Sequence, residues 1–299
     1  MNLGTNRAAV NSHRRGFSEV IQPEASGIFC NRARRFASLS EGHPLSGWLA
    51  FLGQISESQN AVLQTYLPQI LTNKIQSPAV LADNVPPFAA STWPRDQVWR
   101  QVLTRIIDYI EPFAPAHARS SIVRLRKLEE AMLEVLADQI LRMNFSRQYA
   151  NFLPYVSAAL QVYWTALAST INESDVQPDA RGFCPSCGFL PVGSIIRVDG
   201  EVPYLRYLHC GLCNTQWHMV RVTCASCLDS SNQIAYHYIV GKNDAVRAET
   251  CGKCKSYLKI YHQEKSPKVD PIADDLATLA LDLLLDEAGF KRMSPNLLF

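Results

Sequence analysis

The chain has 299 residues, of which 47% are hydrophobic, and its 29 basic side chains outnumber its 27 acidic ones by only two. That length is sufficient for two domains with buried cores. A net charge of +2 gives little support to a dedicated nucleic-acid-binding protein, a class that normally carries a larger excess of Lys and Arg.

The beginning of the chain is polar, with several arginines, and lacks the apolar run of a secretory signal. We therefore expect a cytoplasmic protein whose cysteines stay reduced and available as metal ligands. Residues 1–26 are expected to form a flexible N-terminal segment, followed by a helical domain over residues 27–175.

Apolar residues recur at helical spacing between residues 28 and 171. The predicted helices are 28–39, 45–54, 60–71, 95–110, 117–143 and 149–171. Pro68 should kink or end the third of them. The last is apolar over most of its surface, so it should be the central buried helix. It approaches the length of a membrane span, but its polar residues favour a water-soluble core, and no membrane association is expected.

The composition changes near residue 175. An irregular stretch over 76–94 should wrap over the helices, and a polar linker follows at 172–182. Short strands are predicted at 203–208, 215–222, 234–240 and 256–262. A C-terminal helix over residues 270–290 should have Asp270 as its N-cap and Gly289 at its end.

Eight of the nine cysteines form four CxxC pairs. The pairs are Cys184 with Cys187, Cys210 with Cys213, Cys224 with Cys227, and Cys251 with Cys254. Spacers of 22 and 23 residues lie within the two halves, and only 10 residues separate the halves. This near-repeat favours two consecutive four-cysteine sites over an interleaved cross-brace.

The CxxC spacing lets the chain turn so that both sulfurs point at one metal ion, and a second pair completes a tetrahedron. The position after each pair favours a positive φ, which suits Gly188 and Asn214 better than Leu228 and Lys255. Disulfides, buried free thiols or a redox CxxC explain four regular pairs less well. Zinc is the default metal, but the Cys184-Pro-Ser-Cys-Gly188 turn is of rubredoxin type and leaves iron open.

The predicted fold class is therefore α+β. An N-terminal all-α helical domain is followed by two tandem rubredoxin-like or zinc-ribbon-like small β modules and a C-terminal helix. The first four-cysteine module is expected at 182–220 and the second at 221–265.

Other polar and aromatic residues have two interpretations each. His209 and His218 could replace a sulfur ligand, although eight cysteines leave no need for them. Cys30 is either a small buried hydrophobe or a functional thiol. A basic face at Arg32, Arg34 and Arg35 is either solvated or faces an acidic partner. Six aromatic residues could stack on bases but fit better as core around the metals: Tyr204, Tyr207, Trp217, Tyr236, Tyr238 and Tyr257.

No Ser/His/Asp set, phosphate-binding glycine loop or catalytic carboxylate pair is recognisable in the sequence. Two closed four-cysteine sites would also exclude a substrate from the metal. We therefore expect a protein that is not an enzyme.

The ordered CxxC pairs, together with motifs in the flanking helices, resemble the formate dehydrogenase accessory proteins of the FdhE family. The matching segments are residues 32–39, 43–45, 47–51, 184–188, 206–210, 249–251, 257–259, 273–277, 281–282 and 289–290, with Cys213, Trp217, Cys224, Cys227 and Cys254. The resemblance implies a cytoplasmic maturation factor for respiratory formate dehydrogenase that binds its catalytic subunit before export. It also implies two iron ions, each held by four cysteine thiolates, with zinc as the alternative metal, and a helical domain that serves as the platform for the client.

Two other functions stay open at this point. A rubredoxin-like electron carrier would use the same iron sites. A zinc-ribbon nucleic-acid-binding protein would use the nine Lys and Arg residues of residues 181–262. The same segment contains only five Asp and Glu residues. That mild excess permits weak phosphate contact without demanding it.

Overall fold

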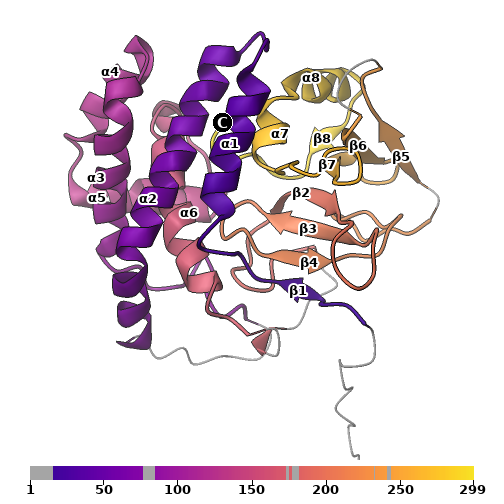
Figure 1. Ribbon diagram of the computed structural model, residues 1–299, viewed down its shortest axis with the longest axis horizontal. Coiled ribbons are helices and arrows are strands. Elements are labelled where there is room, and N and C mark those ends of the chain that lie inside the picture. The colour runs from indigo at the N-terminus through magenta and orange to yellow at the C-terminus, as the bar shows by residue number, and fades with distance from the viewer. Residues whose placement is uncertain (1–15, 77–84, 173–174, 177–181, 232, 241–243) are drawn as a thin grey trace, which may run out of the picture.

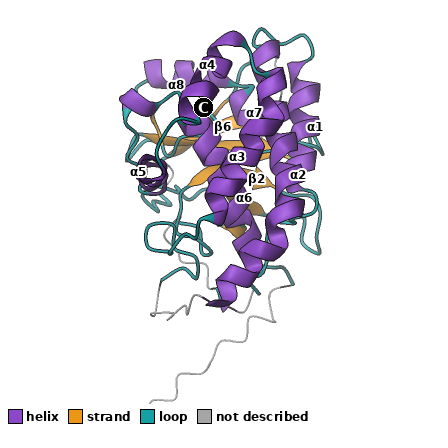
Figure 2. Cartoon of the chain, turned by 90° about the vertical axis from the view of Figure 1, so that its left-hand side faces the viewer, coloured by secondary structure: helices purple, strands orange, loops and turns teal. Residues whose placement is uncertain are grey.

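The computed structural model describes residues 16–76, 85–172, 175–176, 182–231, 233–240 and 244–299 (Figure 1). A layer of helices, mostly from the N-terminal half, packs beside one mixed β-sheet formed mainly by the C-terminal half. Seen from the helical side, the long helices stand in front of the strands (Figure 2). The predicted α+β fold is confirmed. The beginning of the expected flexible segment (1–15) and parts of the predicted connections at 76–94 and 172–182 lie outside the described residues.

The helical layer is organised around one buried helix. Its helices are α1 (Ile28–Ser40), α2 (Ser46–Gln76), α3 (Val98–Ile110), α4 (Ala116–Leu125), α5 (Glu130–Leu141) and α6 (Leu153–Ala168), with short 3-10 turns at Glu111–Phe113 and Arg147–Tyr149. Every residue of α6 except Pro154 is buried. The prediction of a central buried helix is therefore confirmed, and Pro154 lies in its first turn, where no amide is needed.

The two helices predicted at 45–54 and 60–71 are one continuous helix, α2, and Pro68 lies inside it. Three polar residues between the two predicted helices, Ser56, Ser58 and Gln59, are buried. Gln59 donates from Nε2 to the carbonyl of Ala158 at 3.0 Å and to Oε1 of Gln161 at 2.9 Å. These bonds to α6 satisfy a buried amide side chain, so a polar residue occupies a core position without interrupting the helix.

The single long helix predicted over 117–143 is wrong, because the chain breaks between α4 and α5. Arg126, which follows α4, forms ion pairs with Asp108 at 2.7 Å and Glu111 at 2.9 Å at the end of α3. The apolar spacing continues across the break in sequence, and neither Gly nor Pro marks it. Tertiary contacts rather than local propensity therefore determine where α4 ends.

The sheet joins both cysteine modules. Its strands are β1 (Val20–Ile21), β2 (Pro191–Ile196), β3 (Arg206–Cys210), β4 (Gln216–His218), β5 (Ile234–His237), β6 (Val246–Cys251), β7 (Ser256–His262) and β8 (Lys291–Arg292). The order is β1-β4-β3-β2-β7-β6-β5, with β8 also paired to β7. Strands β2 to β4 belong to the first module and β5 to β7 to the second. The modules meet where β2 pairs in parallel with β7, with Ser194 opposite Ile260.

The predicted strand at 256–262 is confirmed as β7, and those at 203–208, 215–222 and 234–240 are confirmed with shifted or shorter bounds. Strands β1, β2, β6 and β8 were missed. Pro191 and Gly193 make β2 resemble a turn in sequence. Gly193 is required by packing, because a Cβ atom there would lie 2.5 Å from the ring of Tyr261 on β7.

The C-terminal helix predicted over 270–290 is divided into α7 (Ala273–Leu276) and α8 (Leu279–Glu287). Asp270 acts as the expected cap, since its Oδ1 accepts the amides of Ile272 and Ala273 at 2.9 and 2.8 Å. Gly289 follows α8 with φ +83°, a conformation that glycine adopts at little cost.

The basic face predicted on α1 is not solvated at two of its three arginines. Arg32 is fully buried and donates from Nε to Asp270 Oδ1 at 3.1 Å. Arg35 forms two bonds of 2.8 and 2.6 Å with the buried carboxylate of Asp274. Only Arg34 is exposed. These pairs fasten α1 to the segment around α7, and both arginine–aspartate contacts join residues more than 230 positions apart.

Candidate metal centres

The eight paired cysteines form two separate clusters. In each cluster the four sulfur atoms all lie within 4.8 Å of one another. The first contains Cys184, Cys187, Cys210 and Cys213, and the second contains Cys224, Cys227, Cys251 and Cys254. This is the consecutive grouping that the spacing predicted, not the cross-brace.

The sulfur spacing fits a four-coordinate metal ion. Cys184 and Cys213 have their sulfurs 3.5 Å apart in the first cluster, and Cys224 and Cys254 have theirs 3.7 Å apart in the second. A disulfide bond is only about 2.05 Å long. A tetrahedral ion with metal–sulfur bonds of about 2.3 Å has sulfur–sulfur edges of about 3.8 Å. Four thiolates in this arrangement suit zinc or iron.

All four CxxC turns share one backbone conformation. The residue after each pair has a positive φ: +71° at Gly188, +63° at Asn214, +61° at Leu228 and +59° at Lys255. The amide of Gly188 donates to the carbonyl of Cys184 at 2.7 Å, and Leu228 and Lys255 repeat this bond to Cys224 and Cys251 at 2.9 Å. Leu228 and Lys255 therefore adopt the turn despite the steric cost of a side chain at positive φ.

The first cluster is sealed between the sheet and the helical layer. Its four cysteines are at most 1% exposed. The loop before α3 covers its first turn, where the amides of Phe88 and Ala90 donate to the carbonyls of Ser186 and Cys187 at 3.0 and 2.8 Å. Helix α6 covers its second turn, where Gln161 Nε2 donates to the carbonyl of Gly211 at 2.8 Å. Burial raises the pKa of the free Cys187 and Cys210 thiols, so a metal ion would have to displace their protons.

Asn214 connects the first cluster to the helices. Its Oδ1 accepts from Arg32 Nη2 at 2.7 Å, and its Nδ2 donates to Thr165 on α6 at 2.9 Å. His209 Nε2 lies 3.3 Å from the same Asn214 oxygen, and burial lowers the pKa of His209 to about 4. His209 therefore stays neutral and hydrogen-bonded to Asn214. The ring of His218 packs at a tilt against Phe17, with ring centroids 4.8 Å apart, and neither histidine belongs to the two clusters.

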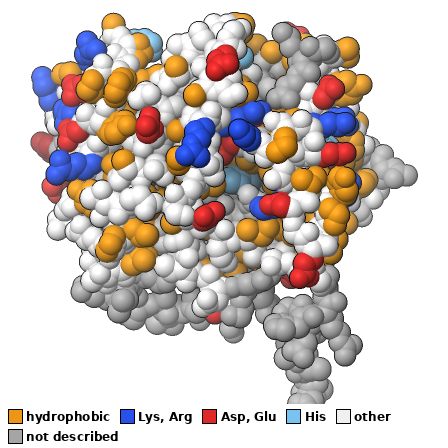
Figure 3. All heavy atoms as spheres, viewed as in Figure 1, with side chains coloured by type: hydrophobic (Ala, Val, Ile, Leu, Met, Phe, Trp, Pro, Cys, Tyr) orange, Lys and Arg blue, Asp and Glu red, His pale blue; other side chains and the backbone are white. Residues whose placement is uncertain are grey.

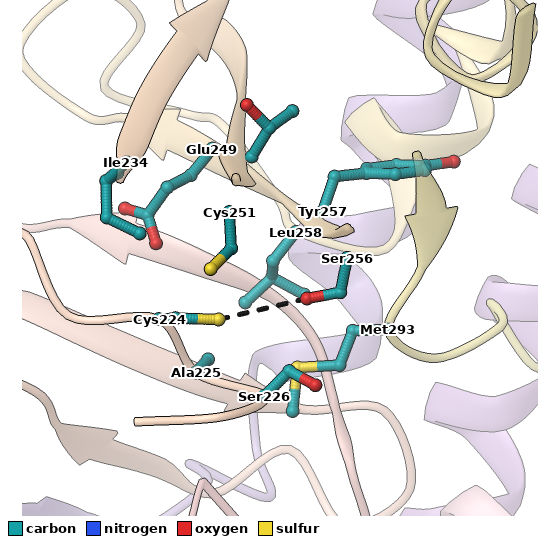
Figure 4. A pocket seen from close by; sticks show the side chains of 11 residues that line it. Cys224, Ala225, Ser226, Ile234, Glu249, Cys251, Ser256, Tyr257, Leu258 and Met293 are labelled. Carbon is teal, nitrogen blue, oxygen red and sulfur yellow. Dashed lines mark hydrogen bonds between the residues drawn. The ribbon is translucent and has the colours of Figure 1, made fainter. Parts of the chain in front are cut away.

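The second cluster reaches the surface. Cys224 and Cys251 are buried, whereas Cys227 is partly buried and Cys254 is exposed. Figure 4 shows the sulfurs of Cys224 and Cys251 directed into the same space, beside a cavity of about 10 Å³. Ser256 lies at its edge, with its hydroxyl 3.8 Å from Cys224 Sγ and 3.0 Å from Cys254 Sγ. The first cluster is therefore shielded from solvent, whereas the second is open to solvent at Cys254.

The Cys254 thiol ionises more readily than an ordinary cysteine. Its partial burial opposes ionisation, but the hydroxyl and amide of Ser256 and the thiols of Cys227 and Cys224 outweigh this effect. Together they lower the pKa of Cys254 to about 6. A low thiol pKa favours the thiolate form that binds metal ions.

The aromatic residues divide equally between the two interpretations. Tyr207, Trp217 and Tyr257 are buried core residues, and Tyr204, Tyr236 and Tyr238 are exposed. Acidic and basic side chains are interspersed over the face seen in Figure 3. That mixed surface resembles an ordinary protein surface more than a phosphate-binding one.

A buried ion cluster ties the second module to the C-terminal helices, and sequence reasoning missed it. Lys259 on β7 contacts Asp275 at 3.0 Å and Asp282 at 2.6 Å, and Asp275 also pairs with Arg292 at 2.5 Å. Lys259 and Arg292 hold the pKa of the Asp275 carboxyl low against the opposing effect of its burial. A lysine inside an otherwise apolar strand was the one available signal, because lysine is almost never fully buried without a partner.

Cys30 on α1 is a partly buried free thiol outside both clusters. In the described chain, no helix combines the length and the apolar character required to cross a bilayer.

Three family models cover most of the chain. The model described as FdhE, N-terminal, matches residues 17–181; FdhE, central domain, matches 183–221; and FdhE, C-terminal domain, matches 222–299. The protein FdhE homolog of Serratia proteamaculans is 38% identical over 286 residues, covering 93% of this chain and 91% of the relative. Protein FdhE of Salmonella paratyphi B is 37% identical over 280 residues, covering 93% and 89%.

The fold agrees with these sequence matches. The crystal structure of the FdhE protein from Pseudomonas aeruginosa superimposes with a TM-score of 0.75 at 32% sequence identity. The match covers 94% of this chain and 98% of that one. By its sequence along nearly the whole length and by its fold, the chain belongs to the FdhE family.

Proposed function

We propose that this chain is a cytoplasmic accessory protein that binds the catalytic subunit of a respiratory formate dehydrogenase and is required for its maturation. The eight clustered cysteines hold two iron ions in this proposal, four thiolates to each. The observation that carries it is the presence of two complete four-cysteine clusters in a member of the FdhE family.

The chain's own residues support metal binding in specific ways. The amides of Leu212 and Cys213 lie 3.4 Å from Cys210 Sγ and can disperse the charge of a thiolate there. The Thr215 hydroxyl lies 3.2 Å from Cys213 Sγ and can donate to it. Iron bound by four thiolates would supply one-electron redox chemistry.

A maturation role without catalysis fits the site geometry. Four sulfur ligands complete a tetrahedral coordination sphere and leave no open position for a substrate. The helical layer is the candidate platform for the client subunit. It forms a broad face of the molecule, on the side opposite strand β5 at the edge of the sheet (Figures 1 and 2).

Deletion of the gene tests the maturation role. The deletion strain should lose formate dehydrogenase activity while the enzyme's subunits are still synthesised, and the wild-type gene should restore activity. Unchanged activity in a deletion strain without a paralogue contradicts the proposal. Co-purification of the catalytic subunit with the tagged protein tests the interaction directly, and absence of that subunit contradicts the binding step.

The metal is tested on protein purified without air. We expect two iron ions per chain and the absorption of thiolate-to-iron charge transfer. Two zinc ions and a colourless protein would exclude iron and, with it, the second candidate function, a rubredoxin-like electron carrier. One observation favours that second function: Cys254 reaches the surface, where an electron-transfer partner can approach the second cluster.

A further inference from the structure

We propose that the two metal centres differ in how readily they exchange their metal. The second cluster gives up its metal to incoming thiolate ligands, whereas the first retains its metal until the helical layer separates from the sheet. This inference rests on the proposed metal binding. The two clusters have the same four-sulfur donor set, so the donor atoms give no reason for different behaviour. The difference comes from what surrounds each cluster.

Among the described residues, contacts between the helical layer and the sheet cover the first cluster. Its sulfurs are buried, and both of its turns are hydrogen-bonded to the helical side through Phe88, Ala90 and Gln161. Asn214 adds bonds to Arg32 on α1 and Thr165 on α6. A competing ligand reaches these sulfurs only after local opening of a tightly packed region, and such openings are rare.

The second cluster is covered neither by the loop before α3 nor by helix α6. Cys254 is exposed and Cys227 is partly exposed. Asp229, just after its first turn, pairs at 2.7 Å with the exposed Lys253 of its second turn. An incoming ligand can therefore approach the metal from the Cys254 side without any rearrangement of the helices.

The surroundings select an anionic ligand. Lys253 and Lys255 flank Cys254 in sequence, and both are exposed. Lys253 is already paired with Asp229, so the charge of Lys255 is the one that attracts a thiolate towards this edge of the cluster. In the exchange step the incoming thiolate would form a bond to the metal as the bond to Cys254 breaks, and the Cys254 sulfur would leave as a thiolate. Repetition at Cys227, and then at Cys224 and Cys251, would release the metal to the competing ligands without any oxidation or reduction.

The test uses the full chain loaded with zinc and exposed to a chromophoric chelator. Two zinc ions per chain should leave in two phases of equal amplitude, with rates that differ by at least about tenfold, because release from the sealed cluster requires local unfolding. N-ethylmaleimide labelling of the wild-type protein, followed by peptide mass analysis, assigns the phases. Cys254 and Cys227 should be modified during the fast phase, and Cys184, Cys187, Cys210 and Cys213 only during the slow one.

Two matched variants complete the test. Cys254→Ser should remove the fast phase and leave one slowly released zinc, whereas Cys213→Ser should remove the slow phase. Lys255→Glu should slow exchange with glutathione while leaving exchange with a neutral thiol unchanged. Equal release rates, or earlier labelling of the first cluster, would overturn the inference even if two metals are bound. A chain that binds no zinc overturns the inference together with the metal-binding proposal.

Discussion

Arg32 on α1 donates a hydrogen bond of 2.7 Å to Oδ1 of Asn214, the residue that follows the last cysteine of the first cluster. The same guanidinium binds Asp270, which caps the segment leading into α7. One buried arginine therefore connects the first helix, a cysteine turn and the C-terminal helices. Arg32 and Asp270 belong to the residues that close the contact between the helical layer and the sheet.

Replacement of Arg32 should destabilise the protein strongly. Arg32→Ala leaves the buried Asp270 carboxylate without its partner, and losing one member of a buried pair costs about 3–5 kcal/mol of unfolding free energy. Arg34→Ala is the matched control, because Arg34 lies on the same helix but is exposed. Denaturant unfolding measures both. A loss for Arg32→Ala no larger than that for Arg34→Ala would contradict the role of the pair.

Glycine should be favourable at both of two equivalent cysteine turns, so introducing it at one and removing it at the other should change stability in opposite directions. Leu228 has φ +61°, and a non-glycine residue there costs about 1–2 kcal/mol. Leu228→Gly should stabilise the protein by up to about 1 kcal/mol, after allowance for the entropy of glycine in the unfolded chain. Gly188→Ala should destabilise it by a similar amount, since Gly188 has φ +71°. Thermal unfolding of metal-loaded protein gives both values, and two changes of the same sign would contradict the shared turn conformation.

Removal of the two metals should have unequal consequences. Cys184→Ala should loosen the helical layer as well as the sheet, because the turn containing Cys184 is bonded to the loop before α3. Cys251→Ala should loosen only the second module. Hydrogen exchange of the α6 amides distinguishes the two variants, with faster exchange expected for Cys184→Ala alone. Equal protection of α6 in both would show that the first cluster does not support the interface.

Stability should fall between neutral and mildly acidic pH because of His262. Burial, together with Arg247 and Arg221, holds the pKa of His262 below its usual 6.5. Below pH 6.5 the unfolded chain therefore binds a proton that the folded chain does not, and stability decreases as the pH falls towards the folded-state pKa. This contribution is absent above about pH 7.5.

His262→Gln isolates that contribution. The difference in unfolding free energy between pH 7.5 and pH 6 should be smaller in the variant than in the wild-type protein. Comparison of the two proteins at each pH removes the shared effect of acid on the thiolates. An identical pH dependence in both would exclude His262 as a source of acid sensitivity.

The cysteine grouping and the buried helix could be predicted because both depend on local sequence spacing. The CxxC pairs and the apolar run at 153–168 can be recognised in the sequence without knowledge of the rest of the fold. The α2 helix could not be read as continuous, because a buried Gln59 looks like a break until its partners on α6 are known. The boundary after α4 likewise depends on Asp108 and Glu111 of another helix.

The role of the α1 arginines was hidden for the same reason. Arg32 and Arg35 lie at a spacing that is typical of a solvated face, and their acidic partners, Asp270 and Asp274, lie near the other end of the chain. Gly193 in β2 is a similar case, since its need for glycine comes from Tyr261 on the neighbouring strand. Contacts between distant segments determine these features, so they cannot be predicted from hydrophobic periodicity along the chain.

Strand β1 determines how one edge of the sheet is completed. The two modules repeat head to tail: β2 and β5 each follow the first cysteine pair of a module, β4 and β7 each follow its second pair, and β2 of one module pairs with β7 of the other. This translational symmetry would let the β5 edge of one molecule join the β4 edge of the next, giving an open-ended polymer. Val20 and Ile21 pair with Trp217 and Gln216 and occupy that β4 edge. The two-residue strand β1 therefore lies where the next unit of such a repeat would pair with β4.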